Sequence, residues 1–235
     1  MTEHSMMDFD ALYQGRSVAV GDVELDVVPW RLDGPQPIVV ELADAGEFTG
    51  PVLESGCGLG DNALFLAERG LEITAFDAAP TAVAQASAKA AERGLKVDFT
   101  VADATRLDGI DGRFNSALDS AMMHCLTDEQ RRDYLAALHA VTNPGAVLHI
   151  LCFPEQTEAL FPMPGHTDEA SLRRDLGQHW RIDRMQMRGY ATAFTPEQWA
   201  AAMPPEATAF LSADSAVDAK GHVQLPIRQI RAVRA

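Results

Sequence analysis

Three glycines stand at alternate positions of a backbone turn suited to holding a cofactor. Gly56, Gly58 and Gly60 follow a short apolar run that begins after Pro51, and a helical pattern over 63–69 comes next. Glycine lets the backbone bend sharply and lets a ligand lie against the main chain, because no Cβ stands in the way. A buried strand, a glycine turn and a helix, in this order, predict the start of a nucleotide-binding βαβ unit.

The spacing of these glycines separates two classes of cofactor. A dinucleotide fingerprint has the pattern G-x-G-x-x-G and places the pyrophosphate at the helix N-terminus. Here the third glycine comes one residue early, and Asp61, at the expected helix start, would repel a phosphate. A cofactor with a positive centre and no phosphate fits better, and S-adenosylmethionine, with its sulfonium and zwitterionic amino-acid end, has this character. The alternatives are a nicotinamide oxidoreductase and an ordinary turn without a ligand.

Three acidic residues each follow a predicted strand. They are Asp77 after 71–76, Asp103 after 96–101 and Asp119 after 114–118. Asp77 lies about 20 residues past the first glycine, the distance at which an acid reaches ribose hydroxyls. Asp103 could accept a hydrogen bond from an exocyclic amine such as that of adenine. Any one of these acids alone is more often a solvated carboxylate or a helix cap. Together they predict a ligand site at the carboxyl edge of one sheet.

These motifs resemble those of class I S-adenosylmethionine-dependent methyltransferases. The resemblance rests on V-L-E-x-G-C-G-x-G at 52–60, F-D-A at 76–78 and A-D-A at 102–104, and it covers residues 28 to 155. It implies one α/β domain, a Rossmann-like sheet of seven strands with helices on both faces, strand order 3-2-1-4-5-7-6 and the last strand antiparallel.

A narrower resemblance points to a thiopurine-methyltransferase-like group of small-molecule enzymes. It rests on Val28-Pro29-Trp30, Gly34-Pro35-Gln36-Pro37, Gly60-Asp61-Asn62 and the run at 119–124. Bacterial members act on quinones, hydroxyquinolones and N-heterocyclic toxins. Glu54 departs from the aspartate that is usual at its position, so the acid is kept but its side chain is longer.

The resemblance also implies which residues bind the cofactor. They are Trp30, Glu54, Gly56, Cys57, Gly58, Gly60, Asn62, Asp77, Ala78, Asp103, Ala104, Asp119 and Ser120. In this setting Trp30 would meet the sulfonium by cation–π attraction, and its alternative is a surface-packed aromatic. No metal is expected.

Two residues are candidates for the catalytic step. His124, just past the fourth strand, is the candidate general base for an alcohol acceptor, and its alternative is a hydrogen-bonded core histidine. An acidic phenol, a thiol or a ring nitrogen needs no base. Tyr13 belongs to a segment, 6–16, with apolar residues at helical spacing. This segment is either a helix packed on the domain or a lid that turns the Tyr13 phenol toward the substrate. Direct transfer needs no covalent intermediate, so Cys125 is expected to serve packing.

The remaining pattern divides one domain, 1–235, into four parts. These are a loop-like entry segment with the lid (1–37), the cofactor-binding core (38–153), a substrate-side cover with the sixth strand (154–222) and the last strand (223–235). Within the cover, five residues are candidates to contact the substrate, with core packing as the alternative: Phe161, Met163, Tyr190, Phe194 and Met203.

Composition excludes several functions. The formal net charge of −15 argues against a nucleic-acid partner, because phosphate backbones need basic patches. The three cysteines form no C-x-x-C pair, which favours reduced thiols over a disulfide or metal site. No signal peptide or membrane-spanning run is expected, so a cytoplasmic enzyme acting on a small aromatic or heterocyclic O-, N- or S-nucleophile is predicted. The alternative is a catalytically silent S-adenosylmethionine-binding protein that acts through partner contacts, and the oligomeric state stays open.

Overall fold

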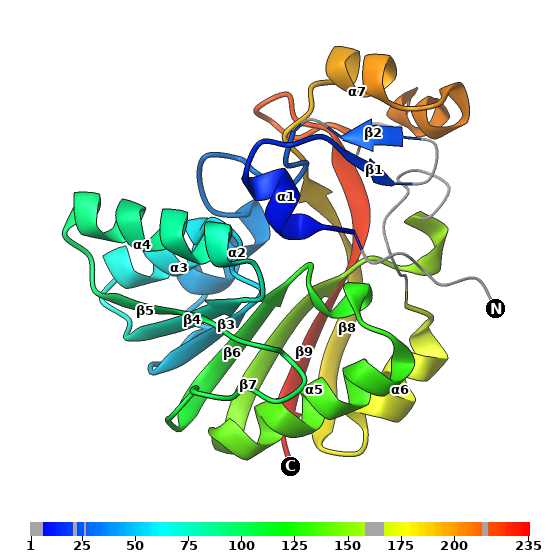
Figure 1. Ribbon diagram of the computed structural model, residues 1–235. Coiled ribbons are helices and arrows are strands. Elements are labelled where there is room, and N and C mark those ends of the chain that lie inside the picture. Colours follow the sequence, from blue (N-terminus) through cyan, green and yellow to red (C-terminus); the bar gives the residue numbers. More distant parts are fainter. Residues whose placement is uncertain (1–6, 21–22, 26, 158–166, 213–215) are drawn as a thin grey trace.

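The central sheet arises from apolar segments that alternate with amphipathic helices. The computed structural model describes residues 7–20, 23–25, 27–157, 167–212 and 216–235. The sheet consists of β3 (Val52–Ser55), β4 (Ile73–Asp77), β5 (Val97–Val101), β6 (Phe114–Ser120), β7 (Thr142–Cys152), β8 (Trp180–Ala191) and β9 (Gln224–Arg234). Their spatial order is β5-β4-β3-β6-β7-β9-β8, and β9 is antiparallel to both neighbours (Figure 1). The predicted order 3-2-1-4-5-7-6 with an antiparallel last strand is therefore confirmed.

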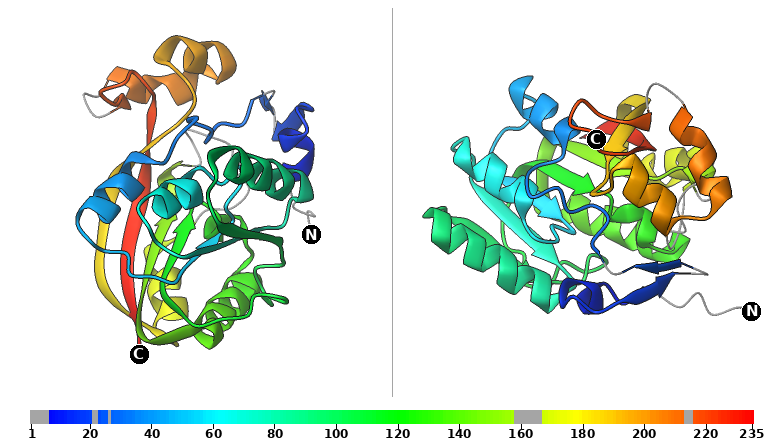
Figure 2. Two further views of the ribbon diagram at one scale, coloured as in Figure 1. Left: turned by 90° about the vertical axis from the view of Figure 1, so that its left-hand side faces the viewer. Right: turned by 90° about the horizontal axis from the view of Figure 1, so that it is seen from above.

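Helices cover both faces of the sheet. The elements are α2 (Pro37–Asp44), α3 (Asp61–Glu68), α4 (Pro80–Arg93), α5 (Asp128–Val141), α6 (Glu169–Leu176) and α7 (Pro196–Ala202), with 3-10 turns η1 (Met123–Cys125), η2 (Glu155–Thr157) and η3 (Pro205–Ser212). Successive strand residues point to opposite faces. In β3, Val52 packs with α2 and α3, whereas Leu53 packs with α5 and α6. Figure 2 shows the resulting layers, with α4 beside α3.

The predicted entry segment differs from the structure. It holds a short helix, α1 (Phe9–Tyr13), and two strands, β1 (Val18–Val20) and β2 (Val23–Leu25), which pair antiparallel. The prediction that 17–37 is loop-like is therefore wrong over these strands. Their sequences, VAV and VEL, are rich in β-branched residues, but three residues each is too short for a clear periodicity signal.

Strands β7 and β8 are long. β7 begins at Thr142, and Pro144 lies within it. Proline is tolerated there because the pairing of β6 with β7 shifts register between Phe114 and Ser116. β8 continues past Met187 to Ala191 because it stays paired with β9 to its end. None of the helices in the described ranges is long and apolar enough to span a bilayer.

Candidate active site

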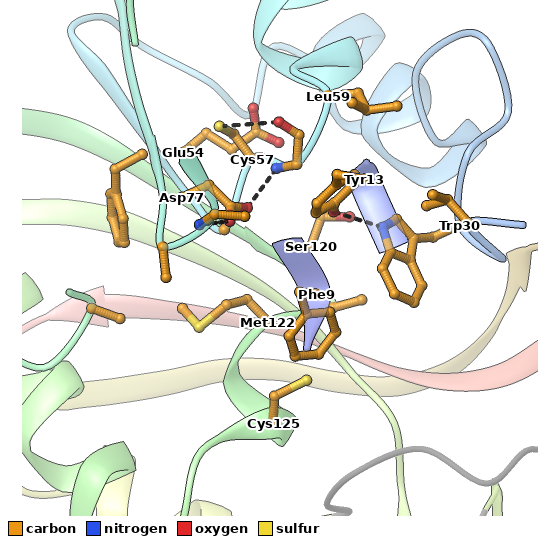
Figure 3. A pocket seen from close by; sticks show the side chains of 18 of the residues that line it. Phe9, Tyr13, Trp30, Glu54, Cys57, Leu59, Asp77, Ser120, Met122 and Cys125 are labelled. Atoms are coloured by element: carbon orange, nitrogen blue, oxygen red, sulfur yellow. Dashed lines mark hydrogen bonds between the residues drawn. The ribbon is translucent and has the colours of Figure 1, made fainter. Parts of the chain in front are cut away.

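A cavity of about 620 Å³ lies at the carboxyl ends of the central strands. Its walls come from the turns after β3, β4, β5 and β6, from α1 and from the segment between β2 and α2. Of the predicted cofactor-binding residues, those that line the cavity are Trp30, Glu54, Gly56, Cys57, Gly58, Asn62, Asp77, Ala78, Asp103, Ala104 and Ser120. In Figure 3, Glu54 and Asp77 lie in the upper part of the cavity and Met122 and Cys125 in the lower part.

The glycine turn brings the main chain close to its neighbours. Gly56 has a positive φ of 64°, and a Cβ there would lie 2.5 Å from the Cβ of Met122. A Cβ on Gly58 would lie 2.7 Å from the Tyr13 hydroxyl. Gly60 does not line the cavity: a Cβ there would lie 2.7 Å from the Phe99 ring and 2.9 Å from Ala86. Gly60 therefore has a packing role, because its absent side chain lets α3 begin against β5 and α4, and its cofactor contact stays a prediction.

Asp77 ties the end of β4 to the glycine turn. Its carboxylate accepts hydrogen bonds from the backbone N–H groups of Gly58 and Ala79, each at 2.8 Å. Burial raises the pKa of Asp77 above its ordinary value, against the opposite effect of these hydrogen bonds. Each carboxylate oxygen has a second lone pair, which can accept from a ligand. Asp77 thus holds the turn and offers acceptors to the cavity at once.

Asp103 offers a more exposed carboxylate at the same edge of the sheet. It accepts from the backbone N–H and the hydroxyl of Thr105, at 2.9 and 2.7 Å. These two hydrogen bonds lower the pKa of Asp103, so it is ionised at neutral pH. It is therefore suited to accept from an amine at the mouth of the cavity.

Two buried acceptor atoms face the cavity without a donor. Glu54 is 1% exposed and Gln36 is 4% exposed. Asn62 donates to Glu54 Oε1 at 3.0 Å, and the Gln36 amide donates to the Ala191 carbonyl at 2.9 Å. Glu54 Oε2 and Gln36 Oε1 accept no hydrogen bond from the described residues. Burial raises the pKa of Glu54 to about 8. A buried acceptor without a partner is costly, so this pair is suited to a ligand that brings N–H donors.

Tyr13 and Trp30 close one side of the cavity. The Trp30 indole N–H donates to the Tyr13 hydroxyl at 3.1 Å, and the Phe9 and Trp30 rings lie 5.9 Å apart (Figure 3). The hydroxyl of Tyr13 lies against Gly58, on the side of the glycine turn. Burial raises the pKa of Tyr13 well above its ordinary value, so the phenol stays neutral near pH 7.

Helix α1 is fastened to the first turn of α4. The N-cap of α4, Ala79, has no side chain that can cap it. Asp10 of α1 supplies the missing cap, accepting from the Thr81 backbone N–H at 2.8 Å. Gln85 of α4 also donates to the Tyr13 carbonyl at 3.0 Å. These contacts hold α1 in place as one wall of the cavity.

Asp119 and His124 do not line the cavity. Asp119 is fully buried and accepts from the backbone N–H groups of Met122 and Met123 and from the Tyr134 hydroxyl, at 3.0, 3.2 and 2.9 Å. The His124 ring is also fully buried, 4.9 Å from the Phe153 ring centre. Neither side chain lines the cavity in this structure, so the cofactor contact of Asp119 and the base role of His124 stay predictions that the geometry does not favour. Asp119 fixes the turn after β6, and His124 belongs to the core.

Next to Tyr13 and Trp30, another wall of the cavity is apolar. It is formed by Met7, Phe9, Val28, Met122, Cys125 and Leu126. Burial raises the pKa of Cys125 to about 12, which is consistent with a packing role. Of the predicted substrate cover, Tyr190 lines this cavity, while Phe194 and Met203 are buried in the core. Phe161 and Met163 lie outside the described residues.

The charge of the cavity is negative. Six of the lining residues are acids, namely Asp8, Asp10, Glu54, Asp61, Asp77 and Asp103, against a single arginine, Arg31, among the described residues. Arg31 pairs with Asp33 at 2.9 Å, and Lys89 pairs with Asp61 at 2.8 Å. The excess of carboxylates favours a cationic ligand and disfavours a polyphosphate.

Sequence reasoning misses one residue of the site and leaves a second one open. Gln36 belongs to a motif but is not among the predicted site residues, whereas Tyr190 is predicted as part of the substrate cover, with core packing as the alternative. The only signal for Gln36 is its position between two prolines, at the start of a helix. Tyr190 reaches the cavity through the long pairing of β8 with β9, which no local pattern indicates.

Known proteins with similar sequences are methyltransferases. Residues 52–145 match a family described as "Methyltransferase domain". A 2-heptyl-1-hydroxyquinolin-4(1H)-one methyltransferase of Mycobacteroides abscessus is 37% identical over 188 residues, which are 78% of this chain and 80% of that protein. A demethylmenaquinone methyltransferase of Thermus thermophilus is 37% identical over 112 residues, 47% of this chain and 50% of that protein.

Solved structures show the same fold. A protein from work on the conversion of a disulfide bond into a thioacetal group during echinomycin biosynthesis has a TM-score of 0.75 and 30% identity, and covers 96% of this chain and 91% of its own. Magnesium protoporphyrin IX methyltransferase from Synechocystis, with bound S-adenosylmethionine, has a TM-score of 0.57 and 18% identity, and covers 84% of this chain and 76% of its own. At that identity the second match shows the fold alone.

Proposed function

The chain belongs to the class I S-adenosylmethionine-dependent methyltransferases, and we propose that it methylates a heteroatom of a small aromatic or heterocyclic molecule. The observation that carries the proposal is one cavity with two unlike halves. One half presents carboxylates and the glycine turn, and the other is apolar. A volume of about 620 Å³ is in the range of small-molecule sites. The relative from Mycobacteroides abscessus, whose name specifies a hydroxyquinolone acceptor, supports this substrate class.

The residues of the first half fit the parts of S-adenosylmethionine. We assign the ribose hydroxyls to Asp77, and an amine of the adenine to Asp103. The two unpartnered acceptors, Glu54 Oε2 and Gln36 Oε1, fit the three N–H donors of an ammonium group. Trp30 offers an aromatic face to the sulfonium.

The acceptor half would orient the substrate and exclude water. When bound, S-adenosylmethionine supplies a methyl group that the acceptor's lone pair takes as the carbon–sulfur bond breaks, its electron pair remaining on sulfur. The acceptor gives up its own proton to solvent, either before it binds or when the methylated product leaves. His124 does not line the cavity, and Tyr13 is held neutral, so neither is placed as a base. We therefore infer an acceptor that sheds its proton readily: an acidic hydroxyl, a thiol or a ring nitrogen.

Cofactor affinity is expected to rise with pH through ionisation of Glu54. Its pKa of about 8 leaves it mostly neutral at pH 7. A bound ammonium favours the carboxylate and lowers this pKa, so binding releases a proton and tightens as pH rises toward 8. S-adenosylhomocysteine, which keeps the amino-acid end, should bind about fivefold tighter at pH 8 than at pH 7. Calorimetry in buffers of different ionisation enthalpy measures both effects. In Glu54→Gln the affinity should depend little on pH. The same dependence of affinity on pH in this variant as in wild type would contradict the proposed role of Glu54.

Loss of the Asp10 cap is expected to speed release of the cofactor. We propose that α1 acts as a lid, and Asp10→Ala removes its attachment to the first turn of α4. Loss of a helix cap is worth roughly 1 kcal/mol, so the dissociation rate of S-adenosylmethionine should rise about fivefold to tenfold. A chase experiment with labelled cofactor measures the rate. Asp111→Ala, an exposed acid outside the cavity, is the control. A wild-type rate in Asp10→Ala would show that α1 is a fixed wall.

The proposed function is tested by methyl transfer from labelled S-adenosylmethionine to a panel of quinones, hydroxyquinolones, thiopurines and N-heterocycles. We expect product with at least one aromatic class. Binding of the cofactor with no product from any acceptor would favour the alternative, a catalytically silent binding protein. Binding of NAD in place of S-adenosylmethionine would contradict the site altogether. A cytoplasmic location, the absence of a metal and the absence of a nucleic-acid partner stay predictions.

A further inference from the structure

Two hydroxyl groups meet at the inner end of the apolar wall. Tyr190 comes from the end of β8 and Ser120 from the end of β6, and both line the cavity. Tyr190 is 3% exposed, so its hydroxyl is directed into the protein rather than to bulk water. Tyr190 also lines a small recess beside the cavity, together with Pro29, Trp30, Ala121, Phe153 and Leu225. The pair therefore sits at the junction of the cavity with its recess.

The geometry of this pair leaves room for a third partner. The two hydroxyl oxygens are 3.4 Å apart, beyond the usual 2.5–3.0 Å of an O–H···O hydrogen bond. The Gln36 side chain also interacts with the Tyr190 hydroxyl, but each hydroxyl has one donor and two acceptor sites, so capacity remains for a further partner. The Tyr190 ring is fixed by edge-to-face packing on Phe153, at 5.5 Å between ring centres, and Phe153 packs in turn on His124. A rigid polar pair in an apolar wall, with Tyr190 buried and Ser120 half-buried, is a specific recognition feature.

The other polar groups of this wall are already occupied. Tyr13 is bonded to Trp30, and Gln130 closes the capping box of α5 with Thr127. Cys125 is at most a weak hydrogen-bonding group. Asp77 and Glu54 lie on the side of the glycine turn, which the proposed function gives to the cofactor. Only Ser120 and Tyr190 remain, among the described residues of the apolar half, to recognise a heteroatom by strong hydrogen bonds.

We propose that the hydroxyls of Tyr190 and Ser120 together bind the heteroatom of the acceptor and set the direction of its lone pair. This inference rests on the proposed function and deepens it. The acceptor's aromatic body lies along the apolar wall, and its heteroatom lies at the hydroxyl pair. A hydroxyl oxygen of the pair accepts a hydrogen bond from an X–H group of the acceptor, or a hydroxyl donates one to the lone pair of the heteroatom. The pair thereby distinguishes an acceptor with a heteroatom at this place from a hydrocarbon of equal shape. A molecule that cannot form this hydrogen bond leaves the polar groups of the site unpaired, and the site therefore discriminates strongly against it.

Three variants test this inference, with an acceptor that the wild-type protein methylates. Tyr190→Phe keeps the ring, so the packing on Phe153 is preserved, and Ser120→Ala removes the second hydroxyl. Ser87→Ala is the control for the serine change, since Ser87 is an exposed residue of α4 whose hydroxyl bonds the Val83 carbonyl. The readouts are kcat/KM for the acceptor, the Kd of S-adenosylmethionine, and the Kd of the acceptor in the presence of S-adenosylhomocysteine.

Tyr190→Phe should weaken acceptor binding and lower kcat/KM for the acceptor by about tenfold to 100-fold. The Kd of S-adenosylmethionine should stay within about twofold of wild type, because the Tyr190 hydroxyl, although it lies near Gln36 and Glu54, is assigned to none of the cofactor's groups. Ser120→Ala should show a smaller effect of the same kind. The double variant should be little worse than Tyr190→Phe, because the two hydroxyls share one ligand atom.

Two results would overturn the inference. One is unchanged acceptor binding and kcat/KM in Tyr190→Phe. The other is an equal loss of S-adenosylmethionine affinity in that variant, which would place Tyr190 in the cofactor site. Failure of the proposed function is distinguishable, because the wild-type protein itself would then methylate no acceptor of the panel.

Discussion

Gly56→Ala should abolish binding of S-adenosylmethionine, while Gly70→Ala should leave it intact. Both glycines have positive φ angles, 64° and 83°, so both substitutions carry a similar backbone penalty of about 1 kcal/mol. The two positions differ in the room that surrounds an added Cβ. A Cβ on Gly56 would lie 2.5 Å from the Cβ and Cγ of Met122, whereas a Cβ on Gly70 meets nothing within 4 Å. Since the Cβ of Met122 is anchored to the backbone, relief of this contact must move the turn after β6 or the glycine turn itself.

Calorimetric titration and thermal melting separate the two effects. We expect both variants to melt slightly below wild type. Only Gly56→Ala should lose the heat of cofactor binding, with affinity lower by about 100-fold or more, because both moving segments line the cavity. Equal affinities in the two variants would show that the glycine turn does not contact the cofactor.

Asp77→Ala is expected to lower the affinity for S-adenosylmethionine by about 100-fold or more. A hydrogen bond to a charged group is worth roughly 1.5–3 kcal/mol, and a ribose offers two hydroxyls to this carboxylate. The substitution also removes the acceptor of the Gly58 N–H, which loosens the turn that would hold the cofactor. The loss of affinity should therefore exceed what the ribose contacts alone supply.

The measurement is the Kd of S-adenosylmethionine for Asp77→Ala and for a matched control, Asp98→Ala. Asp98 lies on the neighbouring strand β5, is exposed and does not line the cavity. We expect the control to bind as wild type does. A wild-type Kd in a correctly folded Asp77→Ala protein would contradict the assignment of the ribose hydroxyls to Asp77.

The local sequence pattern predicts the central sheet well, because strand ends and helix starts depend on residues that are close in the sequence. The apolar run at 52–55, the glycine turn and the acid at 77 each report a strand end or a helix start, and the order of strands follows from the family that these motifs resemble. Capping boxes at Thr127 and Thr195 likewise mark the starts of α5 and α7 from sequence alone, because the cap and its partner are three residues apart.

The direction of a side chain at a strand end is harder to predict. Asp119 and Ser120 are neighbours, yet successive strand residues point to opposite faces of the sheet. Ser120 therefore lines the cavity, and Asp119 turns into the core, where it bonds Tyr134. His124 follows on the same buried side, packed on Phe153. Sequence spacing identifies the correct edge of the sheet, but not which of its polar residues face the ligand.

Contacts between distant segments are the second limit. The cap that Asp10 gives to α4 joins residues 71 positions apart, and the bond from Gln36 to the Ala191 carbonyl joins residues 155 positions apart. Tyr190 reaches Ser120 across 70 residues. No local periodicity carries these pairings, so the lid attachment and the hydroxyl pair emerge only from the folded chain.

A crystal structure of the protein with S-adenosylhomocysteine tests the central claim most directly. We expect the ribose hydroxyls on Asp77, the adenine beside Asp103, the amino group at Glu54 and Gln36, and the hydroxyls of Tyr190 and Ser120 left open for the acceptor. A nucleoside bound outside this cavity, or a ribose directed away from Asp77, would contradict it.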